Sequence, residues 1–323
     1  MMLDMVVVMD PIGAINIAKD STFAMLLEAQ RRGHRLHYVV PGGLGMRDGA
    51  ATALLAPLQV RDDPSDWFAL GPAARRGLGA GDVVLVRTDP PVDAEYIHDT
   101  QVLGLAQAAG AMVVNDPQGL RDFNEKLAAL RFPECCPPTL VSRDAAALKA
   151  FVAEHGQAVL KPLDGMGGRS IFRAAAGDPN LNVILETLTG GGRSLAMAQR
   201  WLPEIAGGDK RILLVDGVAV DYCLARIPQG DEFRGNLAAG GRGEARPLTE
   251  RDRWIASRVG PEMQRRGMLF VGLDVIGDWL TEVNVTSPTC IREIDKAYGL
   301  NIAGLLFDAI ERRATGNGER GTA

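Results

Sequence analysis

Acidic side chains interrupt two apolar segments near the carboxyl end of the chain, between residues 270 and 285. Asp274 lies in the first segment, and Glu282 and Asn284 lie two residues apart in the second. Residues two apart in a strand point to the same face, so Glu282 and Asn284 would project together. Oxygen donors with open positions suit Mg²⁺, which proteins bind through one or two carboxylates plus substrate phosphates. The stretch therefore predicts a metal site of Asp274, Glu282 and Asn284, although a solvated sheet face would give the same pattern.

The three oxygen donors can share one face only if the pairing of the two strands is irregular. A turn at Gly277 and Asp278 would join the strands. A plain two-residue turn would place Asp274 opposite Thr281, and Glu282 would then point to the other face. We therefore predict a connection of odd length or a β-bulge between these strands.

Two glycine-rich segments carry groups that could bind phosphate. Lys161 ends a predicted strand, and the segment 162–173 that follows it contains three glycines. Such a backbone can bring successive N–H groups to an anion, and Lys161 and Ser170 add donors. It matches neither a Walker loop nor a dinucleotide fingerprint, because no GK[ST] follows and a strand replaces the expected helix. The second segment, 226–246, contains several arginines and could close over a phosphorylated intermediate. A bare hairpin and a disordered surface loop are the respective alternatives.

The composition favours a multidomain protein that acts on small molecules. The chain has 323 residues, of which 46% are hydrophobic, and a net charge of −5. Single cores stop growing at about 250–300 residues, so two or more domains are expected. No Lys/Arg run resembles a nucleic-acid or membrane footprint, and no segment approaches the roughly 18 apolar residues of a membrane span. The start of the chain is too short and too acidic for a signal peptide. We therefore expect a cytoplasmic protein with no nucleic-acid or membrane partner.

The four cysteines show no CxxC spacing and are too few for a disulfide framework, so reduced thiols are expected. Cys290 lies beside the acidic segments and could act as a nucleophile. No histidine lies near it in the sequence, so this role has little support.

Strands and helices alternate in the first third of the chain, which predicts a parallel sheet. A helix is expected to begin at a Ser21 or Thr22 cap and to stop at Gly33. Ligands in such sheets lie beyond the carboxyl ends of the strands, where this chain has polar residues such as Asp10. Residues 42–81 lack clear periodicity, and we interpret them only as a variable insertion. Further strands are expected at 5–9, 35–40, 83–87, 112–115, 139–142, 158–161, 195–201, 210–215 and 218–225, and further helices at 93–109, 144–155, from Thr249 and at 301–313. The strands at 210–215 and 218–225 are expected to form a hairpin with a turn at Asp216 and Gly217.

The order of these groups resembles that of the ATP-grasp ligases, and several segments resemble the prokaryotic glutathione synthetases. The most specific segments are residues 236–243, Asn-Leu-Ala-Ala-Gly-Gly-Arg-Gly, and residues 282–289, Glu-Val-Asn-Val-Thr-Ser-Pro-Thr. The resemblance runs from about residue 5 to about residue 313 and departs mainly at 42–81. Other matching segments are 9–11, 19–21, 160–172 and 225–230.

The resemblance implies an α/β, multi-domain fold in which an N-terminal parallel-sheet domain precedes a two-part ATP-grasp fold. The implied activity is ATP-dependent joining of γ-glutamylcysteine to glycine through an acyl phosphate, giving glutathione, ADP and phosphate. Two Mg²⁺ ions per site are expected, with Mn²⁺ as an alternative, and so is a homo-oligomer. The implied divisions are a Rossmann-like substrate domain at 1–123, a central ATP-grasp part at 124–202, a C-terminal part with the metal site at 203–314, and a flexible tail at 315–323.

The resemblance also implies roles for individual residues, in addition to the metal set. Residues expected to contact ATP are Lys126, Lys161, Asp164, Gly165, Gly167, Gly168, Ser170, Gln199, Trp201, Leu202 and Asp209. Residues expected at the reacting phosphoryl and acyl groups, or in the segment that shields them, are Arg211, Arg226, Arg234, Gly240 and Gly241. Residues expected to contact the dipeptide or glycine are Asn16, Asp20, Ser21, Arg87, Ser287, Thr289 and Arg292.

Two other functions fit the same motifs. One is a different ATP-grasp ligase, such as one that joins D-alanines or adds glutamate to a peptide. The other is an ATP-binding regulatory protein that kept the fold and lost turnover. Loss of a metal ligand or of a catalytic arginine usually marks such a protein, and neither is lost here.

Overall fold

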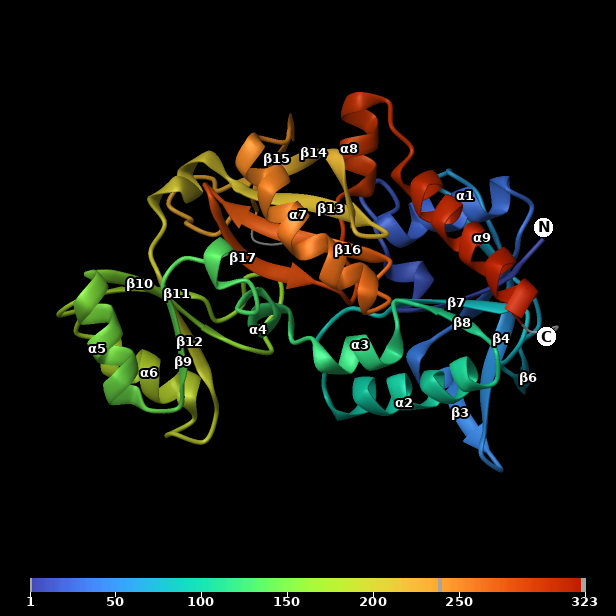
Figure 1. The fold of residues 1–323 in the computed structure, drawn as a ribbon, viewed down its shortest axis with the longest axis horizontal. Coiled ribbons are helices and arrows are strands. Elements are labelled where there is room, and N and C mark those ends of the chain that lie inside the picture. The colour runs from blue at the N-terminus through green and yellow to red at the C-terminus, as the bar shows by residue number, and fades with distance from the viewer. Residues whose placement is uncertain (1, 238–239, 321–323) are drawn as a thin grey trace.

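The structure is a computed structural model that describes residues 2–237 and 240–320, with only the backbone for residues 316–320 (Figure 1). The strands of the described residues form three sheets. In Figure 1 the four-stranded sheet lies on the left, the five-stranded sheet at the upper centre and the eight-stranded sheet on the right.

The eight-stranded sheet contains the parallel core that alternating strands and helices predicted. Strands β2, β1, β7 and β8 are adjacent in this order and parallel. Their bounds are β1 Asp4–Met9, β2 Arg35–Val39, β7 Asp82–Arg87 and β8 Met112–Val114, and the accompanying helices are α1 Ser21–Arg31 and α2 Ala94–Ala108. The predicted cap of α1 was wrong. Asp20 is the N-cap, and its Oδ1 accepts a hydrogen bond of 2.6 Å from Phe23 N.

Residues 42–81, to which the sequence assigned no element, add antiparallel strands to this sheet. Strand β4 pairs with β2 and also with β3, β5 and β6. Alternate residues such as Ala51, Ala53 and Leu55 are buried. Alanine is depleted in strands, so this alternation gave a weak signal. The bounds are η2 Pro41–Gly43, β3 Leu44–Arg47, β4 Ala50–Val60, β5 Phe68–Leu70 and β6 Ala74–Gly77.

The four-stranded sheet is antiparallel, with the strand order β11-β10-β12-β9, and has a hydrophobic core of its own. Leu148 of α5 and Leu185 of α6 pack against Leu160 of β10 in this core. The bounds are β9 Thr139–Ser142, α5 Ala145–His155, β10 Gln157–Pro162, β11 Phe172–Ala175, α6 Leu181–Thr189 and β12 Ala196–Arg200.

The five-stranded sheet has the order β15-β14-β13-β16-β17 and is antiparallel. Asp216 and Gly217 form the predicted hairpin turn, with φ values of 50° and 79° that suit a type I′ turn. Segment 226–246 was interpreted as a loop, but its first two residues belong to β14 and its last five to β15, so that interpretation was wrong at both ends. The bounds are β13 Asp209–Val215, β14 Val218–Ile227, β15 Arg242–Pro247, α7 Glu250–Arg265, β16 Phe270–Ile276 and β17 Trp279–Asn284.

The remaining helices connect these parts. Helices α8 and α9 pack against α1, and one hydrophobic core runs from Val84 of the first sheet to Leu273 of the five-stranded sheet. Helix α9 continues beyond its expected end, so residues 315–320 of the expected tail are helical, while 321–323 lie outside the described residues. None of the helices in the described part is long and apolar enough to cross a bilayer. The bounds are η1 Ile12–Ala14, α3 Pro117–Asp122, α4 Glu125–Ala129, η3 Pro133–Cys135, η4 Pro203–Gly207, α8 Ile291–Tyr298 and α9 Ile302–Arg320.

Candidate active site

The two acidic strands contain the predicted β-bulge. Ile276 pairs with Trp279, as a two-residue turn requires, but Asp274 pairs with Glu282 because the register shifts by one residue. Thr281 is the extra residue, and its Oγ1 donates a hydrogen bond of 3.1 Å to the carbonyl oxygen of Asp274. The bulge therefore brings the two carboxylates to the same face of the sheet.

Two buried arginines surround Asp274. Arg211, its pairing partner on β13, donates from Nε to Oδ1 at 2.6 Å, and Nη2 of Arg226 lies 2.9 Å from Oδ2. Burial alone would raise the pKa of Asp274, but the two guanidinium groups hold this pKa well below its usual range. Arg226 also donates to Asp209, whose pKa burial raises to about 6. These four side chains form one buried network of alternating charge.

Gly272 creates the space that Arg211 needs to reach Asp274. A Cβ atom at this glycine would lie 2.9 Å from Cδ of Arg211 and 2.9 Å from Cβ of Pro288. Both distances are far shorter than ordinary van der Waals contacts, so a side chain at this position would displace the guanidinium or the proline.

Two lysines surround Glu282. The Nζ atoms of Lys161 and Lys126 lie 3.4 Å and 3.6 Å from its Oε1. Burial opposes ionisation, but the two lysines lower the pKa of Glu282 below its ordinary value. Nζ of Lys126 also donates a hydrogen bond of 2.6 Å to the carbonyl oxygen of Gly165. The lysines thus connect the acidic strands to the first glycine-rich segment.

Two cavities meet at Asp274 and Glu282. The first cavity has largely apolar walls, in which the rings of Trp201 and Phe233 lie 5.9 Å apart at 72°. The second is more polar, because Arg211 and several other charged or hydroxyl-bearing residues line it. Residues that line both cavities are Gly165, Met166, Gly167, Asn236, Asp274 and Glu282.

The two glycine-rich segments touch each other above the first cavity. Nη1 of Arg234 donates a hydrogen bond of 2.8 Å to the carbonyl oxygen of Gly168. Glu232 accepts from Nε and Nη2 of the same arginine, at 3.0 Å and 2.5 Å, and fixes its orientation. The segment that could shield an intermediate is therefore joined directly to the segment that could bind phosphate.

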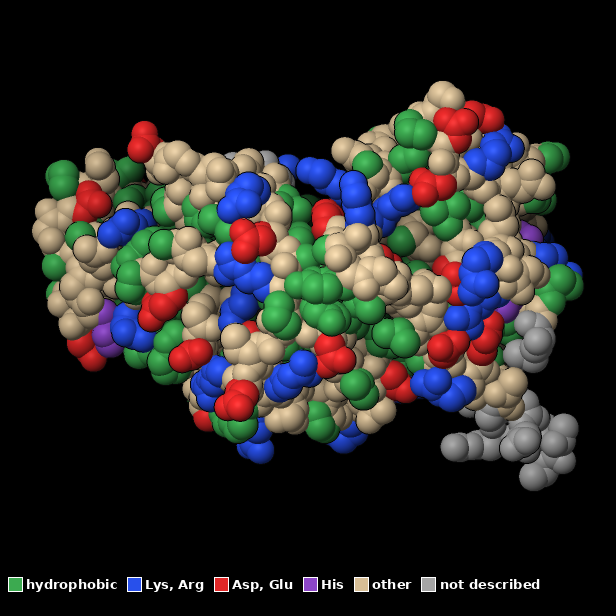
Figure 2. All heavy atoms as spheres, turned by 90° about the horizontal axis from the view of Figure 1, so that it is seen from above, with side chains coloured by type: hydrophobic (Ala, Val, Ile, Leu, Met, Phe, Trp, Pro, Cys, Tyr) green, Lys and Arg blue, Asp and Glu red, His purple; other side chains and the backbone are tan. Residues whose placement is uncertain are grey.

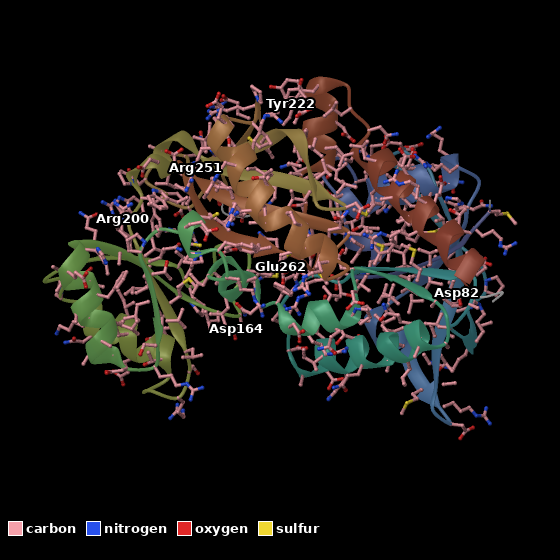
Figure 3. The ribbon with its side chains drawn as sticks, in the orientation of Figure 1. Asp82, Asp164, Arg200, Tyr222, Arg251 and Glu262 are labelled. Atoms are coloured by element: carbon pink, nitrogen blue, oxygen red, sulfur yellow. The ribbon has the colours of Figure 1, made fainter. Side chains whose placement is uncertain are left out.

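Most of the predicted site residues line one of the two cavities. Those that do are Lys126, Lys161, Gly165, Gly167, Gly168, Gln199, Trp201, Leu202, Asp209, Arg211, Arg226, Arg234, Asp274, Glu282, Asn284, Ser287 and Thr289. Asp164 and Ser170 are exposed and line neither, and Figure 3 shows Asp164 at the outer edge of its segment. Gly240 and Gly241 also line neither, and the two residues before them lie outside the described part of the chain.

Five predicted substrate residues, Asn16, Asp20, Ser21, Arg87 and Arg292, lie outside the cavity walls. Oγ of Ser21 accepts a hydrogen bond of 3.1 Å from Ile291 N, and Nη2 of Arg87 donates one of 2.9 Å to the Pro288 carbonyl oxygen. Arg292 pairs with Asp62 at 2.7 Å. Ser21 and Arg87 therefore support the backbone after β17 from behind, a contact that sequence could not reveal.

Several lining residues escaped the sequence analysis. Phe233 directly precedes Arg234, and an aromatic residue in a cationic loop was the signal that could have identified it. Asn236 begins segment 236–243, one of the segments that carry the family resemblance, but no role was predicted for it. Glu125 precedes Lys126 and carried no signal apart from its position at a helix start.

Cys290 lies in the wall of the second cavity, where burial raises the pKa of its thiol. A raised pKa keeps the thiol protonated, which disfavours a nucleophile. No histidine is among the residues described as lining that cavity, so the structure adds nothing to the alternative of a cysteine nucleophile.

Basic side chains gather beside the notch between the two lobes of the molecule in the space-filling view (Figure 2). On the rest of that face basic and acidic side chains alternate, without the continuous basic stripe that nucleic-acid binding uses.

Family models and similar proteins of known name match both the N-terminal part and the ATP-grasp part of this chain. Residues 3–121 match the family model of the prokaryotic glutathione synthetase N-terminal domain, and residues 125–299 match that of its ATP-grasp domain. The glutathione synthetase of Xanthomonas axonopodis pv. citri (strain 306) is 77% identical over 97% of this chain and 99% of its own. That of Pseudomonas putida (strain KT2440) is 59% identical over 95% of this chain and 97% of its own. The solved D-cycloserine synthetase DcsG is similar in fold, with a TM-score of 0.66 at 15% identity over 96% of this chain and 99% of its own. The chain therefore belongs to the prokaryotic glutathione synthetase family, and it is an ATP-dependent ligase that forms glutathione.

Proposed function

We propose that the first cavity binds ATP and the second binds γ-glutamylcysteine, so that the γ-phosphoryl group and the cysteinyl carboxylate meet beside Asp274 and Glu282. The observation that carries this proposal is the shared wall of the two cavities, which contains both carboxylates and the first glycine-rich segment. A shared wall provides the proximity and orientation that phosphoryl transfer requires.

The shape and chemistry of the first cavity support adenine at its apolar end. Trp201 and Phe233 provide flat aromatic surfaces, and Leu202, which also lines the cavity, would meet the edge of the base through its backbone. Lys126 and Lys161 line the same cavity beside Glu282 and the first glycine-rich segment, where they would neutralise the phosphates. Asp209 is the candidate partner of the ribose, since its buried Oδ1 has no hydrogen-bond partner among the described residues.

The fixed charges around the shared wall support binding of divalent cations. Six basic groups and five carboxylates line the two cavities, namely Lys126, Lys161, Arg200, Arg211, Arg226 and Arg234 against Asp89, Glu125, Asp209, Asp274 and Glu282. Because these charges nearly cancel, most of the negative charge of a bound triphosphate requires cations from solution. We assign two Mg²⁺ ions to Asp274, Glu282 and Asn284, whose oxygen atoms are the hard ligands that Mg²⁺ prefers. Held by these three residues, Mg²⁺ would supply the positive charge that neutralises the negative charge developing on the phosphates.

The metal set depends on an amide oxygen as well as on carboxylates. Within the described residues no three Asp, Glu, His or Cys side chains converge as a metal site, so Asn284 and the phosphates of the nucleotide must supply the remaining ligands. Nδ2 of Asn284 donates a hydrogen bond of 3.3 Å to the Gly272 carbonyl oxygen, which leaves its amide oxygen available. Mn²⁺ also accepts oxygen ligands and is proposed as a substitute.

The reaction proceeds in two displacements. An oxygen of the cysteinyl carboxylate attacks the γ-phosphorus of ATP, the bond from this phosphorus to the bridging oxygen breaks, and ADP leaves. The nitrogen of glycine then attacks the acyl carbon, the bond to the phosphate oxygen breaks, and the nitrogen loses a proton. Arg211 and Arg226 line the second cavity, where their planar donors would suit the negative charge that develops on the phosphoryl and acyl oxygens. The segment that includes Arg234 would exclude water from the acyl phosphate.

Transfer of heavy oxygen tests the acyl phosphate. γ-Glutamylcysteine labelled in both cysteinyl carboxylate oxygens should transfer one labelled atom to inorganic phosphate and keep the other in the new peptide bond. Mass spectrometry of the phosphate measures this transfer. Unlabelled phosphate at full turnover would contradict an acyl phosphate.

Three further properties are proposed by family resemblance. The three sheets support functional divisions at 1–123, 124–202 and 203–314. A homo-oligomer is expected in the cytoplasm, and light scattering of the purified protein measures its size.

A further inference from the structure

Glu125 occupies the start of α4 and binds the backbone immediately after strand β17. Its Oε1 accepts hydrogen bonds from Val285 N at 2.9 Å, from Thr286 N at 3.1 Å and from Thr286 Oγ1 at 2.8 Å. These two residues directly follow Asn284, and the Glu125 side chain also lines the second cavity. Three donors therefore converge on one carboxylate oxygen, which fixes the backbone of Val285 and Thr286 to α4.

The same turn of α4 holds the first glycine-rich segment. Lys126 donates to the carbonyl oxygen of Gly165 at 2.6 Å, and Nδ2 of Asn124 donates to that of Leu163 at 3.0 Å. Three consecutive residues of the chain thus connect the segment proposed to bind phosphate with the backbone that leaves β17. Helix α4 packs against β17, and in Figure 1 it lies between the four-stranded sheet and helix α3.

A second anchor fixes Val285 from the opposite side. Nδ2 of Asn115 donates to the carbonyl oxygen of Val285 at 2.7 Å and to that of Phe270 at 2.8 Å. Asn115 therefore ties β17 to β16 and to the first domain, whereas Glu125 ties the exit of β17 to α4. Only the contact made by Glu125 connects this backbone to the residues proposed to bind phosphate.

The backbone anchored by Glu125 forms one wall of the second cavity. Thr286, Ser287, Pro288, Thr289 and Cys290 all line it. An ionised carboxylate makes stronger hydrogen bonds to N–H and O–H donors than a neutral amide does. Burial raises the pKa of Glu125, and the three donors counteract that effect.

We propose that Glu125 is a positioning residue for the second displacement, which sets segment 286–290 relative to the phosphate held by Lys126. The inference rests on the proposed function, because it takes this segment to hold the reactants of amide formation beside the acyl phosphate. Without the anchor the acyl phosphate still forms, but the amine of glycine meets it less often. Water then attacks the acyl carbon instead, which releases phosphate and returns γ-glutamylcysteine. One ATP is consumed without formation of glutathione.

The test compares Glu125→Gln with the unchanged protein in steady-state kinetics. Glutamine keeps the size of the side chain but binds the three donors more weakly. We expect kcat/KM for glycine to fall about 100-fold, the typical effect of an ångström-scale misplacement of a reactant. The KM for ATP should change less than about twofold, since uniform nucleotide binding is retained. More than one ADP should be released per glutathione formed, whereas the unchanged protein releases one.

Two further variants separate positioning from general destabilisation. Thr286→Val removes only the hydroxyl donor and should produce the same pattern in weaker form, even if Glu125→Gln does not fold. Asp252→Asn alters another carboxylate, which is 0% exposed, accepts from Thr249 N at 3.0 Å and lines neither cavity. It should lower thermal stability and leave both the ADP-to-glutathione ratio and the KM for glycine unchanged.

The proposal is overturned if Glu125→Gln and Thr286→Val keep one ADP per glutathione and an unchanged kcat/KM for glycine. It is also overturned if both variants behave like Asp252→Asn, with lower stability and normal coupling. An unchanged protein that forms no glutathione would instead contradict the proposed function, so the two failures are distinguishable.

Discussion

Asp274 lies directly opposite Glu282 across strands β16 and β17, with Thr281 bulged out beside them. In the regular register Glu282 would point to the opposite face, where neighbouring residues such as Val283 are fully buried. The bulge instead gives both carboxylates access to the lysines that line the first cavity and to the buried arginines that line the second. Without this one extra residue, Glu282 would be buried among apolar side chains, away from its basic partners.

Replacement of Glu282 should abolish most turnover without unfolding the protein. Glu282→Gln keeps the side-chain volume but removes the charge that faces Lys126 and Lys161. We expect kcat to fall by about 100-fold or more and the Mg²⁺ concentration for half-maximal activity to rise. Circular dichroism should be unchanged. Glu262→Gln, on an outer helix (Figure 3), is the matched control and should retain full activity. Near-normal turnover of Glu282→Gln would rule out a metal role for this residue.

A methyl group at position 272 should disturb the arginine that faces Asp274. Gly272→Ala places a carbon 2.9 Å from Cδ of Arg211 and 2.9 Å from Cβ of Pro288. Overpacking of this kind costs about 1–3 kcal/mol of unfolding free energy, and we also expect a fall in kcat. Urea denaturation and steady-state rates measure the two effects. Gly104→Ala in α2 is the control, because an added Cβ meets nothing within 4 Å there. Equal behaviour of both variants would show that the space at position 272 is not needed.

How far the sequence predicted the site depends on how local each signal is. The acidic pair, its bulge and the Asp216 turn were predicted because strand alternation and turn chemistry involve neighbouring residues. The role of Glu125 was not, since its partners Val285 and Thr286 lie about 160 residues away in the chain. Strand β4 was missed because half of its buried residues are alanine, which is depleted in strands and gives a weak alternation signal.

The orientation of individual side chains was the other property that the sequence could not predict. Ser21 and Arg87 were predicted near the substrate, and both lie close to segment 287–292, but they bind its backbone instead of facing the cavity. The position of Ser21 and Arg87 within the family motifs correctly indicated that they lie near this segment. Which side of the loop a side chain contacts depends on how α1, β7 and α8 pack, and no local pattern encodes that packing.

The aromatic walls of the first cavity should determine affinity for ATP more than turnover. Trp201→Leu and Phe233→Leu each remove a flat surface from the proposed adenine site. We expect the KM for ATP to rise about tenfold in either variant, since base–aromatic stacking contributes about 1–3 kcal/mol, while kcat stays within about threefold. Trp254→Leu, which alters an exposed tryptophan on α7, should change neither constant. A changed kcat with an unchanged KM would place the adenine elsewhere.

Stability should depend on pH through Glu28, which connects two arginines of α1 and its C-cap. Hydrogen bonds from Arg31 and then Arg32 lower the pKa of Glu28 from 4.5 to about 2. A carboxylate with a lowered folded-state pKa stabilises the fold above its unfolded pKa, and this contribution is lost as the pH falls through 4.5 towards 2. Glu28→Gln should therefore lower the unfolding free energy by about 1–2 kcal/mol at neutral pH. The difference should shrink in acid, and denaturation curves in which it stays constant would contradict the pairing.

The most direct test of the central claim is an assay of purified protein with ATP, Mg²⁺ and pairs of acyl and amine substrates. With γ-glutamylcysteine and glycine together, we predict release of ADP and phosphate in equal amounts with glutathione. Omission of either substrate should stop glutathione formation, and pairs such as two D-alanines or a peptide with glutamate should give no ligation. ADP release that requires one of those other pairs and does not occur with γ-glutamylcysteine and glycine would contradict the assignment.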